Sequence, residues 1–211
     1  MNLNVLIGLA MGLNLLALGS SRIPSVIRAM SVQGVLLGIM PVLLATELDW
    51  HVAIVALATV TGKGLVIPAL LRRAMRAVSI EREVEPIVGF ELSLLLGAGA
   101  TIGAVATARW LPVLPEHSGT LLVPGAMATV ATGFILLVGR VKAITQVCGY
   151  LILENGIYLF GLLLIRSTPV LVEAGVLLDV TVGVFVIGII VDRIQRTFDS
   201  LDTRKLTALR E

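Results

Sequence analysis

GYLILENGIYLFG, residues 149–161, places an acid and an amide, Glu154 and Asn155, in the middle of a run of apolar residues. The apolar run continues in both directions, over about residues 143–165, until basic residues flank it. A bilayer core of about 30 Å requires about 20 apolar residues per helix, and this stretch has that length. It therefore predicts a membrane-spanning helix with an ionisable group at its centre.

The composition of the whole chain indicates an integral membrane protein. Of its 211 residues, 57% are hydrophobic and 14% are charged, and the mean hydropathy of +1.00 is far above that of a soluble domain. Little chain remains between the apolar stretches, so there is no room for a soluble catalytic domain. Seven stretches have the length and polarity of spanning helices, at about residues 2–20, 24–46, 51–71, 87–108, 119–139, 143–165 and 169–191. The predicted fold class is all-α, a polytopic bundle of seven helices.

The basic residues predict the orientation of this bundle, because positively charged loops stay in the cytoplasm. If the amino terminus is outside, only Arg109 and Arg166 fall in outer loops. We therefore expect the amino terminus outside and the carboxyl terminus in the cytoplasm. The basic residues on the cytoplasmic side are then Arg22, Arg28, Arg72, Arg73, Arg76, Arg82, Arg140, Lys142, Arg193, Arg196, Arg204, Lys205 and Arg210.

An internal repeat predicts how the spans are related. VTGKGLVIPALLRRAMR, residues 60–76, matches VTVGVFVIGIIVDRIQR, residues 180–196, at six of seventeen positions, arginines included. The stretches that begin at Arg22 and Arg140 match more weakly. These matches suggest two three-helix units in the same orientation; chance similarity between apolar helices is the alternative. The expected organisation is one transmembrane domain over 1–195, with repeat A at 1–77, a central helix at 86–110, repeat B at 119–194 and a cytoplasmic tail at 196–211.

Five ionisable residues fall inside the predicted spans. Each costs about 2.5–3.5 kcal/mol at a helix centre on insertion scales, so its presence needs a reason. At 1.5 Å per residue, Glu154, Asp179 and Lys63 lie about 15–18 Å from the ends of their helices and so share the bilayer midplane. The five candidates for a proton path are Glu154, Asp179, Lys63, Glu91 and Glu173, with Asn155 in support.

These charges have two interpretations. A carboxylic acid held inside the bilayer beside a lysine can take up and release a proton near neutral pH, and such a coupled set can relay protons. A static ion pair of Glu154 and Lys63 that only fixes helix packing is the alternative; four carboxylates for one lysine favour the relay. Glu173 also fits a carboxylate that snorkels to the outer interface, and Glu91 fits the same role at the inner face.

The sequence carries no motif of a self-contained enzyme. It has no Gly-rich phosphate loop before a helix, no histidine pair at metal-ligand spacing and no Ser-His-Asp set. His51 and His117 are expected in outer loops, and Cys148 is the only cysteine. We therefore expect no catalytic group and no metal site in this chain.

The carboxyl-terminal third carries a family resemblance. RVKAITQVCGYLILENGIYLFGLLL, residues 140–164, and the stretch over 177–203 resemble the last two helices of the K subunit of respiratory complex I and of the C subunit of multisubunit cation/proton antiporters. Together with the tail FDSLDTRKLTALRE, residues 198–211, they more closely resemble the hydrogenase-4 family of E-type membrane subunits, found in formate hydrogenlyase-type, group 4 NiFe hydrogenases. Relative to the K-subunit motif, Glu154 lies three residues beyond the usual Glu, and Asp179 replaces a Glu.

This resemblance implies a non-catalytic subunit in the membrane arm of a hydrogenase complex, with a part in proton translocation and scaffolding. The nickel–iron and iron–sulfur centres would then belong to partner subunits, and this chain would hold no cofactor. The implied partners are antiporter-like membrane subunits, a quinone-site-like H-type membrane subunit, the hydrogenase large and small subunits and the lipid bilayer, but no nucleic acid. The implied location is the prokaryotic cytoplasmic (inner) membrane. A C-subunit-like antiporter component and an independent secondary transporter remain alternatives, as does a purely structural scaffold.

Overall fold

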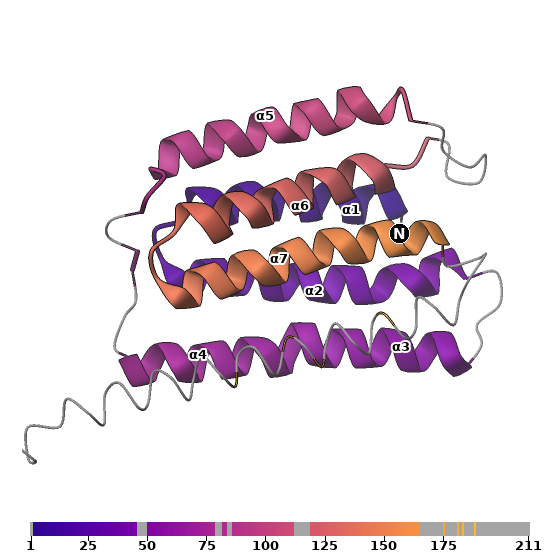
Figure 1. Cartoon of the computed structure of the whole chain (residues 1–211). Helices are drawn as coiled ribbons and strands as arrows, with labels where there is room; N and C mark the ends of the chain where they lie inside the picture. The colour runs from indigo at the N-terminus through magenta and orange to yellow at the C-terminus, as the bar shows by residue number, and fades with distance from the viewer. Residues whose placement is uncertain are drawn as a thin grey trace, which may run out of the picture.

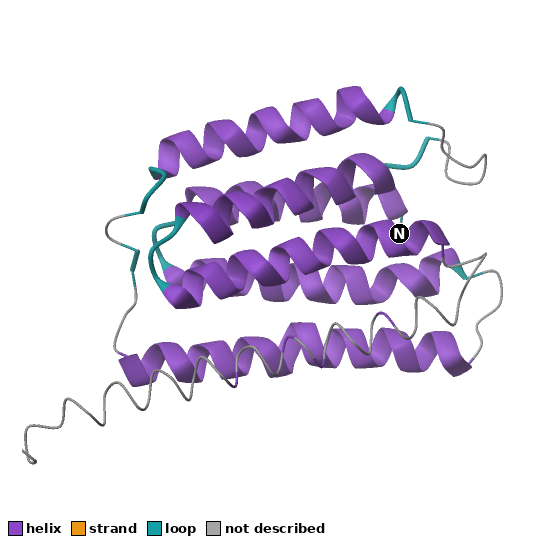
Figure 2. Ribbon diagram, in the orientation of Figure 1, coloured by secondary structure: helices purple, strands orange, loops and turns teal. Residues whose placement is uncertain are grey.

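The protein is a bundle of long helices that run side by side (Figure 1). The computed structural model describes residues 2–45, 50–78, 82–83, 86–111 and 119–164, together with the single positions 175, 181, 183 and 188, which are helical. Figure 2 shows that the helices are joined by short loops in the described part of the chain. The elements are α1 (Leu3–Gly19), α2 (Ile23–Leu44), α3 (Trp50–Thr61), the π-helix η1 (Gly62–Val66), α4 (Ile67–Val78), α5 (Phe90–Ala108), α6 (Leu122–Gly139), α7 (Ala143–Gly161) and the 3-10 helix η3 (Leu162–Leu164).

The prediction of an all-helical membrane protein is confirmed for the described residues. Five helices are long and apolar enough to cross a membrane, and α1, with 17 residues, is apolar but shorter. The third predicted span is one continuous helix made of α3, η1 and α4, and it reaches Val78, beyond the predicted end near residue 71. The seventh predicted span, 169–191, lies outside the described residues apart from the four single positions.

The helices α2 and α7 form the centre of the described bundle. On one side of them lie α1 and α6, and α5 packs outside that pair (Figure 1). On the other side the long helix α3–η1–α4 packs against α2, and its α4 part also reaches α7. Segments far apart in the sequence therefore meet at the centre of the bundle.

Glycines allow α6 and α7 to pack with their backbones in contact. A Cβ atom on Gly149 would lie 2.7 Å from the backbone nitrogen of Leu137, and one on Gly156 would lie 2.6 Å from that of Val130. No larger residue fits at either place without moving the helices apart. Small residues have this use in membrane proteins, where close backbone approach replaces the hydrophobic effect as a source of helix association.

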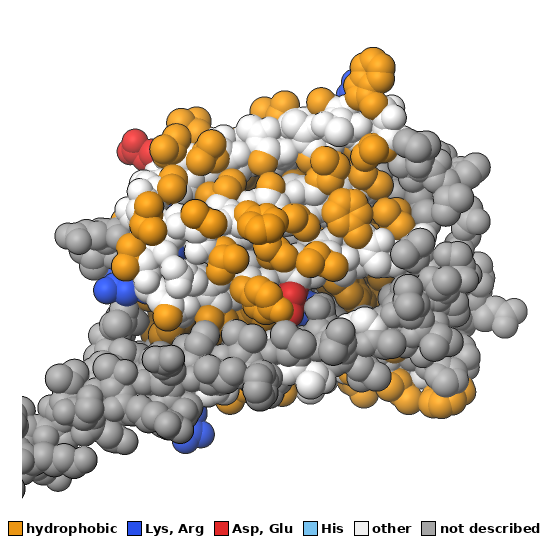
Figure 3. Space-filling view, viewed as in Figure 1, with side chains coloured by type: hydrophobic (Ala, Val, Ile, Leu, Met, Phe, Trp, Pro, Cys, Tyr) orange, Lys and Arg blue, Asp and Glu red, His pale blue; other side chains and the backbone are white. Residues whose placement is uncertain are grey.

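The apolar interior consists of two clusters at different depths. One cluster includes Leu18, Ile27 and Cys148, and the other, nearer the start of α1, includes Leu6 and Leu159. Buried polar side chains lie between the two clusters. Hydrophobic side chains are also spread over the described part of the face seen in Figure 3, which suits contact with lipid.

Arg140, after the end of α6, ties helices together at one end of the bundle. Its side chain is 1% exposed and donates hydrogen bonds to the carbonyl oxygens of Leu18, at 2.6 Å, and Val88, at 2.9 Å. The guanidinium carbon also lies 4.5 Å from the ring centroid of Phe90. Burial lowers the pKa of Arg140 from its ordinary value, while the charge of nearby Glu83 acts in the opposite direction. The residue thus links α1, α5 and α6.

Glu83 completes this end of the bundle. Its buried carboxylate accepts hydrogen bonds from the backbone N–H groups of Val141, at 3.1 Å, and Lys142, at 3.2 Å. It also accepts one from the Thr145 hydroxyl at 3.0 Å. A negative charge at a helix amino terminus is favourable because it satisfies free N–H groups and complements the helix dipole. Glu83 therefore caps α7 from a loop about 60 residues earlier in the sequence.

Candidate functional site

Five buried polar side chains form a continuous chain of hydrogen bonds across the middle of the bundle. We refer to them as the polar chain: Lys63 of η1, Asn155 of α7, Gln33 of α2, Asn14 of α1 and Thr129 of α6. The successive donor–acceptor distances are 3.1, 3.1, 2.9 and 2.9 Å. All five side chains are at most 4% exposed. The polar chain thus joins five elements at one depth, between the two apolar clusters.

Lys63 gives the polar chain a single direction. An ammonium group has three donors and no acceptor, so Asn155 must present its Oδ1 atom to Lys63 and its Nδ2 atom to the next residue. Each following amide is oriented in the same way, and the chain ends where the Thr129 hydroxyl donates to the Gly125 carbonyl oxygen at 2.7 Å. Primary amides do not titrate near neutral pH. The amides therefore orient and stabilise the charge on Lys63, which is the one charged member of the polar chain.

A π-helical turn presents Lys63 to the polar chain. The turn covers Gly62–Val66 and is followed by Pro68, which has no backbone N–H to donate to Gly64. The Ser31 hydroxyl of α2 donates to the Gly64 carbonyl oxygen instead, at 2.7 Å. Turns of this kind inside α-helices are frequent at functional sites because they change which side chains face the interior.

Gly34 lets the π-helical turn approach α2 closely. A Cβ atom at Gly34 would lie 2.7 Å from the Lys63 Cβ atom and 3.1 Å from the Lys63 carbonyl carbon. The Lys63 ammonium also lies 5.6 Å from the ring centroid of Tyr158, within the range of a cation–π interaction. The ammonium is therefore held between an amide oxygen and an aromatic ring.

Glu154 lies next to the polar chain but faces a different neighbour. Its side chain is 3% exposed. Its Oε2 atom is 3.9 Å from the position that a Cβ atom on Gly183 would occupy, so the carboxylate lies beside Gly183. Consecutive helical residues point about 100° apart, which explains why Asn155 reaches α2 while Glu154 turns toward Gly183.

The structure brings some of the predicted site residues together and separates others. Lys63, Asn155 and Glu154 lie at one depth near the bundle centre, as their positions in the sequence predicted. Glu91 is exposed in the first turn of the outer helix α5 and does not join the polar chain. Glu173 and Asp179 lie outside the described residues. The proton-carrying role of all five charged residues remains a prediction.

Three members of the polar chain, Asn14, Gln33 and Thr129, were not predicted from the sequence, because only ionisable residues inside the spans were taken as candidates. The signal was present for the two amides, because a side-chain amide inside an apolar span is costly unless it is hydrogen-bonded. Two amides on neighbouring spans, at a depth similar to that of Asn155, could have been proposed as partners.

No metal site accompanies the polar chain in the described part of the protein. No group of three His, Cys, Asp or Glu side chains comes together among the residues searched.

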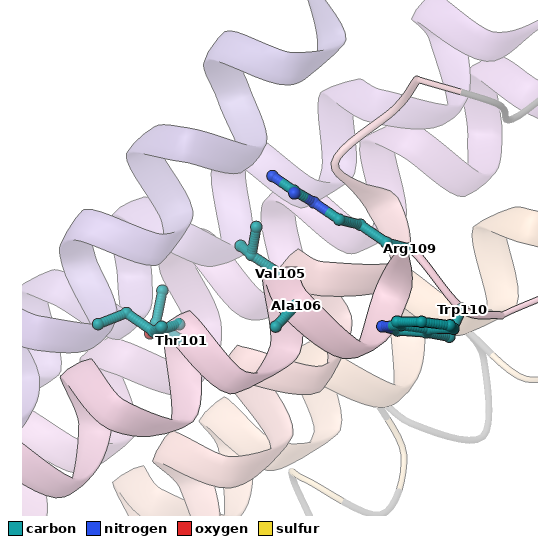
Figure 4. Close-up of a pocket in the computed structure, with 6 residues that line it drawn as sticks. Thr101, Val105, Ala106, Arg109 and Trp110 are labelled. Carbon is teal, nitrogen blue, oxygen red and sulfur yellow. The ribbon is translucent and has the colours of Figure 1, made fainter.

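A groove lies elsewhere, at the end of α5, lined by Thr101, Ile102, Val105, Ala106, Arg109 and Trp110 (Figure 4). Trp110 is 88% exposed there, and an exposed tryptophan beside an arginine is typical of an anchor at the membrane interface.

Comparison with known proteins identifies relatives. A protein of Mycobacterium tuberculosis described as "Uncharacterized protein Rv0085" is 35% identical over 191 residues, which cover 89% of this chain and 86% of the relative. The chain belongs to the family of this mycobacterial protein. No family model matches the chain, and no solved structure matches it.

A second group of relatives is more distant. "Hydrogenase-4 component E" of Escherichia coli K12 is 29% identical over 150 residues, which cover 70% of this chain and 68% of the relative. The protein of the same name from Shigella flexneri matches to the same extent. This distant homology agrees with the family resemblance seen in the sequence. The relationship to the K subunit of complex I stays a prediction.

Proposed function

We propose that the protein is a non-catalytic membrane subunit of a group 4 NiFe hydrogenase complex of the formate hydrogenlyase type. The homology to hydrogenase-4 component E is the observation that carries this proposal. The partners would be antiporter-like membrane subunits, an H-type membrane subunit and the hydrogenase large and small subunits, which would hold the metal centres. The complex would lie in the inner membrane.

Within such a complex, we assign the chain a part in proton translocation. Lys63 and Glu154 are both ionisable and buried. The Lys63 ammonium donates to Asn155, which is the residue after Glu154 in α7. A proton that leaves Lys63 removes the charge that orients the polar chain, so the protonation of Lys63 is coupled to the orientation of amides on α1 and α2. Asp179 would join these two residues at the midplane, Glu173 would extend the path toward the outer face, and Glu91 would extend it toward the cytoplasm.

The distribution of charge supports an outer amino terminus. The ends of α4 and α6 and the starts of α2, α5 and α7 meet at one end of the bundle (Figure 1). Eight described basic residues lie at or near this end: Arg22, Arg28, Arg72, Arg73, Arg76, Arg82, Arg140 and Lys142. Trp50 and Trp110 lie at the opposite end, where they are 63% and 88% exposed. In this proposal the basic end faces the cytoplasm, and a seventh span completes the second three-helix repeat.

An independent transporter or an antiporter component is the second candidate. The π-helical turn with Pro68 interrupts a spanning helix at the depth of the polar chain, and transporters use such interruptions to build midplane ion sites. Here the interruption presents an ammonium rather than backbone carbonyls. An ammonium repels a sodium ion, so the polar chain is poorly suited to sodium binding. The hydrogenase proposal is preferred because of the homology to hydrogenase-4 component E.

The first test is purification of the tagged chain from native membranes in mild detergent. Recovery of hydrogenase and antiporter-like chains together with nickel and iron is expected. Recovery of antiporter chains without hydrogenase chains or metal would favour the antiporter component, and recovery of the protein alone would favour the transporter.

The second test measures proton transport in membrane vesicles that contain the complex. Lys63→Met and Glu154→Gln should leave the complex assembled and lower the number of protons moved per electron, because each change removes an ionisable group from the proposed path. Lys142→Met is the matched control, since it removes a lysine outside the spans. Unchanged coupling in both test variants would limit the protein to a scaffolding role.

A further inference from the structure

Three arginines gather on one face of α4 at the basic end of the bundle. Arg72, Arg73 and Arg76, together with Ala69, line a hollow of about 350 Å³. At 3.6 residues per turn these four positions fall within an arc of about 100°. The small side chain of Ala69 leaves the space that the arginine side chains surround.

The three guanidinium groups have no hydrogen-bond or ion-pair partner among the described residues. Arg140, at the same end of the bundle, differs, since it donates to two backbone carbonyls and contacts Phe90. Of the described carboxylates at this end, Glu83 is bonded to the start of α7, and Glu91 lies on α5, on the far side of the bundle from α4. The hollow therefore concentrates positive charge that this part of the protein does not neutralise.

An exposed apolar strip continues from this hollow along the same spanning helix. Leu65, one turn before Ala69, is 62% exposed, and Val66 beside it is 42% exposed. Leu57, two turns further from the arginines, is 68% exposed. A charged hollow at the end of a helix and an apolar strip leading into the bilayer match the headgroup and the acyl chain of a lipid.

We propose that this face of α4 binds an anionic phospholipid, with the phosphate between Arg72, Arg73 and Arg76 and an acyl chain along Leu65 and Leu57. Guanidinium groups suit this ligand because they bind phosphate oxygens in pairs. Basic residues beside a spanning helix attract anionic lipids. The apolar strip favours a lipid over an acidic protein segment. The site depends on the membrane location of the chain and not on the hydrogenase proposal.

Native mass spectrometry of the full chain, released from bilayers of phosphatidylcholine and phosphatidylglycerol, tests the proposal. The wild type should retain phosphatidylglycerol preferentially. Arg→Gln changes at positions 72, 73 and 76 are made singly and together in a triple variant. Each change should lower this preference about fivefold, because an arginine near an anionic lipid surface contributes about a factor of five in affinity. The matched control changes Arg22, Arg28 and Arg82 to Gln, which removes the same charge from exposed positions at the same end.

A second variant keeps every charge and so preserves the orientation of the chain. Ala69→Trp fills the hollow and should lower the preference by a similar amount without loss of folding, because Ala69 is exposed. Equal retention in the wild type, the triple variant and Ala69→Trp would overturn the proposal. An equal loss in the control triple would also overturn it, since the attraction would then be diffuse. Displacement of the lipid by millimolar inorganic phosphate would show that free phosphate, rather than a lipid, is the ligand.

Discussion

Gly34→Ala tests whether close packing of α2 against the π-helical turn positions Lys63. The new Cβ atom would lie 2.7 Å from the Lys63 Cβ atom, whereas carbon atoms in contact are about 3.5–4.0 Å apart. The turn must therefore move by about 1 Å. Such a shift would lengthen the 3.1 Å bond from Lys63 to Asn155 beyond hydrogen-bond range.

The expected cost combines overpacking with the weakened hydrogen bond. Overpacking costs about 1–3 kcal/mol, and alanine recovers up to about 1 kcal/mol through its higher helix propensity. We therefore expect Gly34→Ala to lower the free energy of unfolding by about 2 kcal/mol. The measurement is reversible unfolding in mixed micelles with a denaturing detergent.

Gly8→Ala is the matched control, because no atom lies within 4 Å of a Cβ atom at that position on α1. The control should be neutral or slightly more stable than the wild type. Equal unfolding free energies for the two variants would refute the packing argument. Proton transport provides a second readout, since Gly34→Ala should lower it while Gly8→Ala leaves it unchanged.

Two further predictions concern backbone groups that side chains satisfy. Ser31→Ala should lower the unfolding free energy by about 1 kcal/mol, since it removes the donor to the Gly64 carbonyl oxygen. In a Pro68→Ala background the loss should be smaller, because the backbone N–H of residue 68 can then donate to the same carbonyl. A double-mutant cycle that shows no coupling between the two positions would contradict this. Glu83→Gln should cost about 1–2 kcal/mol in the same unfolding assay, because a neutral amide accepts more weakly from the start of α7 and from Thr145. Wild-type stability of this variant would show that the cap contributes nothing.

The helices themselves could be predicted from the sequence with good accuracy. Apolar stretches of about 20 residues separated by charged or turn residues must form helices in a bilayer, since no other arrangement satisfies the backbone hydrogen bonds of a single span. The predicted span at 143–165 agrees with α7 and η3, and that at 24–46 agrees with α2. The length of the third helix was underestimated, because its basic last turns extend past the apolar run.

The depth of the central polar residues also followed from the sequence. Counting residues from the helix ends placed Lys63 and Glu154 at one level, and the structure brings Lys63 to the residue beside Glu154. Counting does not define the rotation of each helix about its axis. For that reason the sequence did not predict the hydrogen bond from Lys63 to Asn155, and it gave no role to Gln33.

The sequence by itself thus determined that the chain is a membrane-embedded helical protein with polar groups near the middle of its spans. Only the tertiary structure decided which groups meet. Lys63 and Asn155 are 92 residues apart, and Asn155 and Gln33 are 122 apart. Their contact depends on the π-helical turn and on the close approach at Gly34. The physical reason is that depth is a property of one helix and its length, whereas a hydrogen bond requires the rotation and spacing of two helices to be set together by packing.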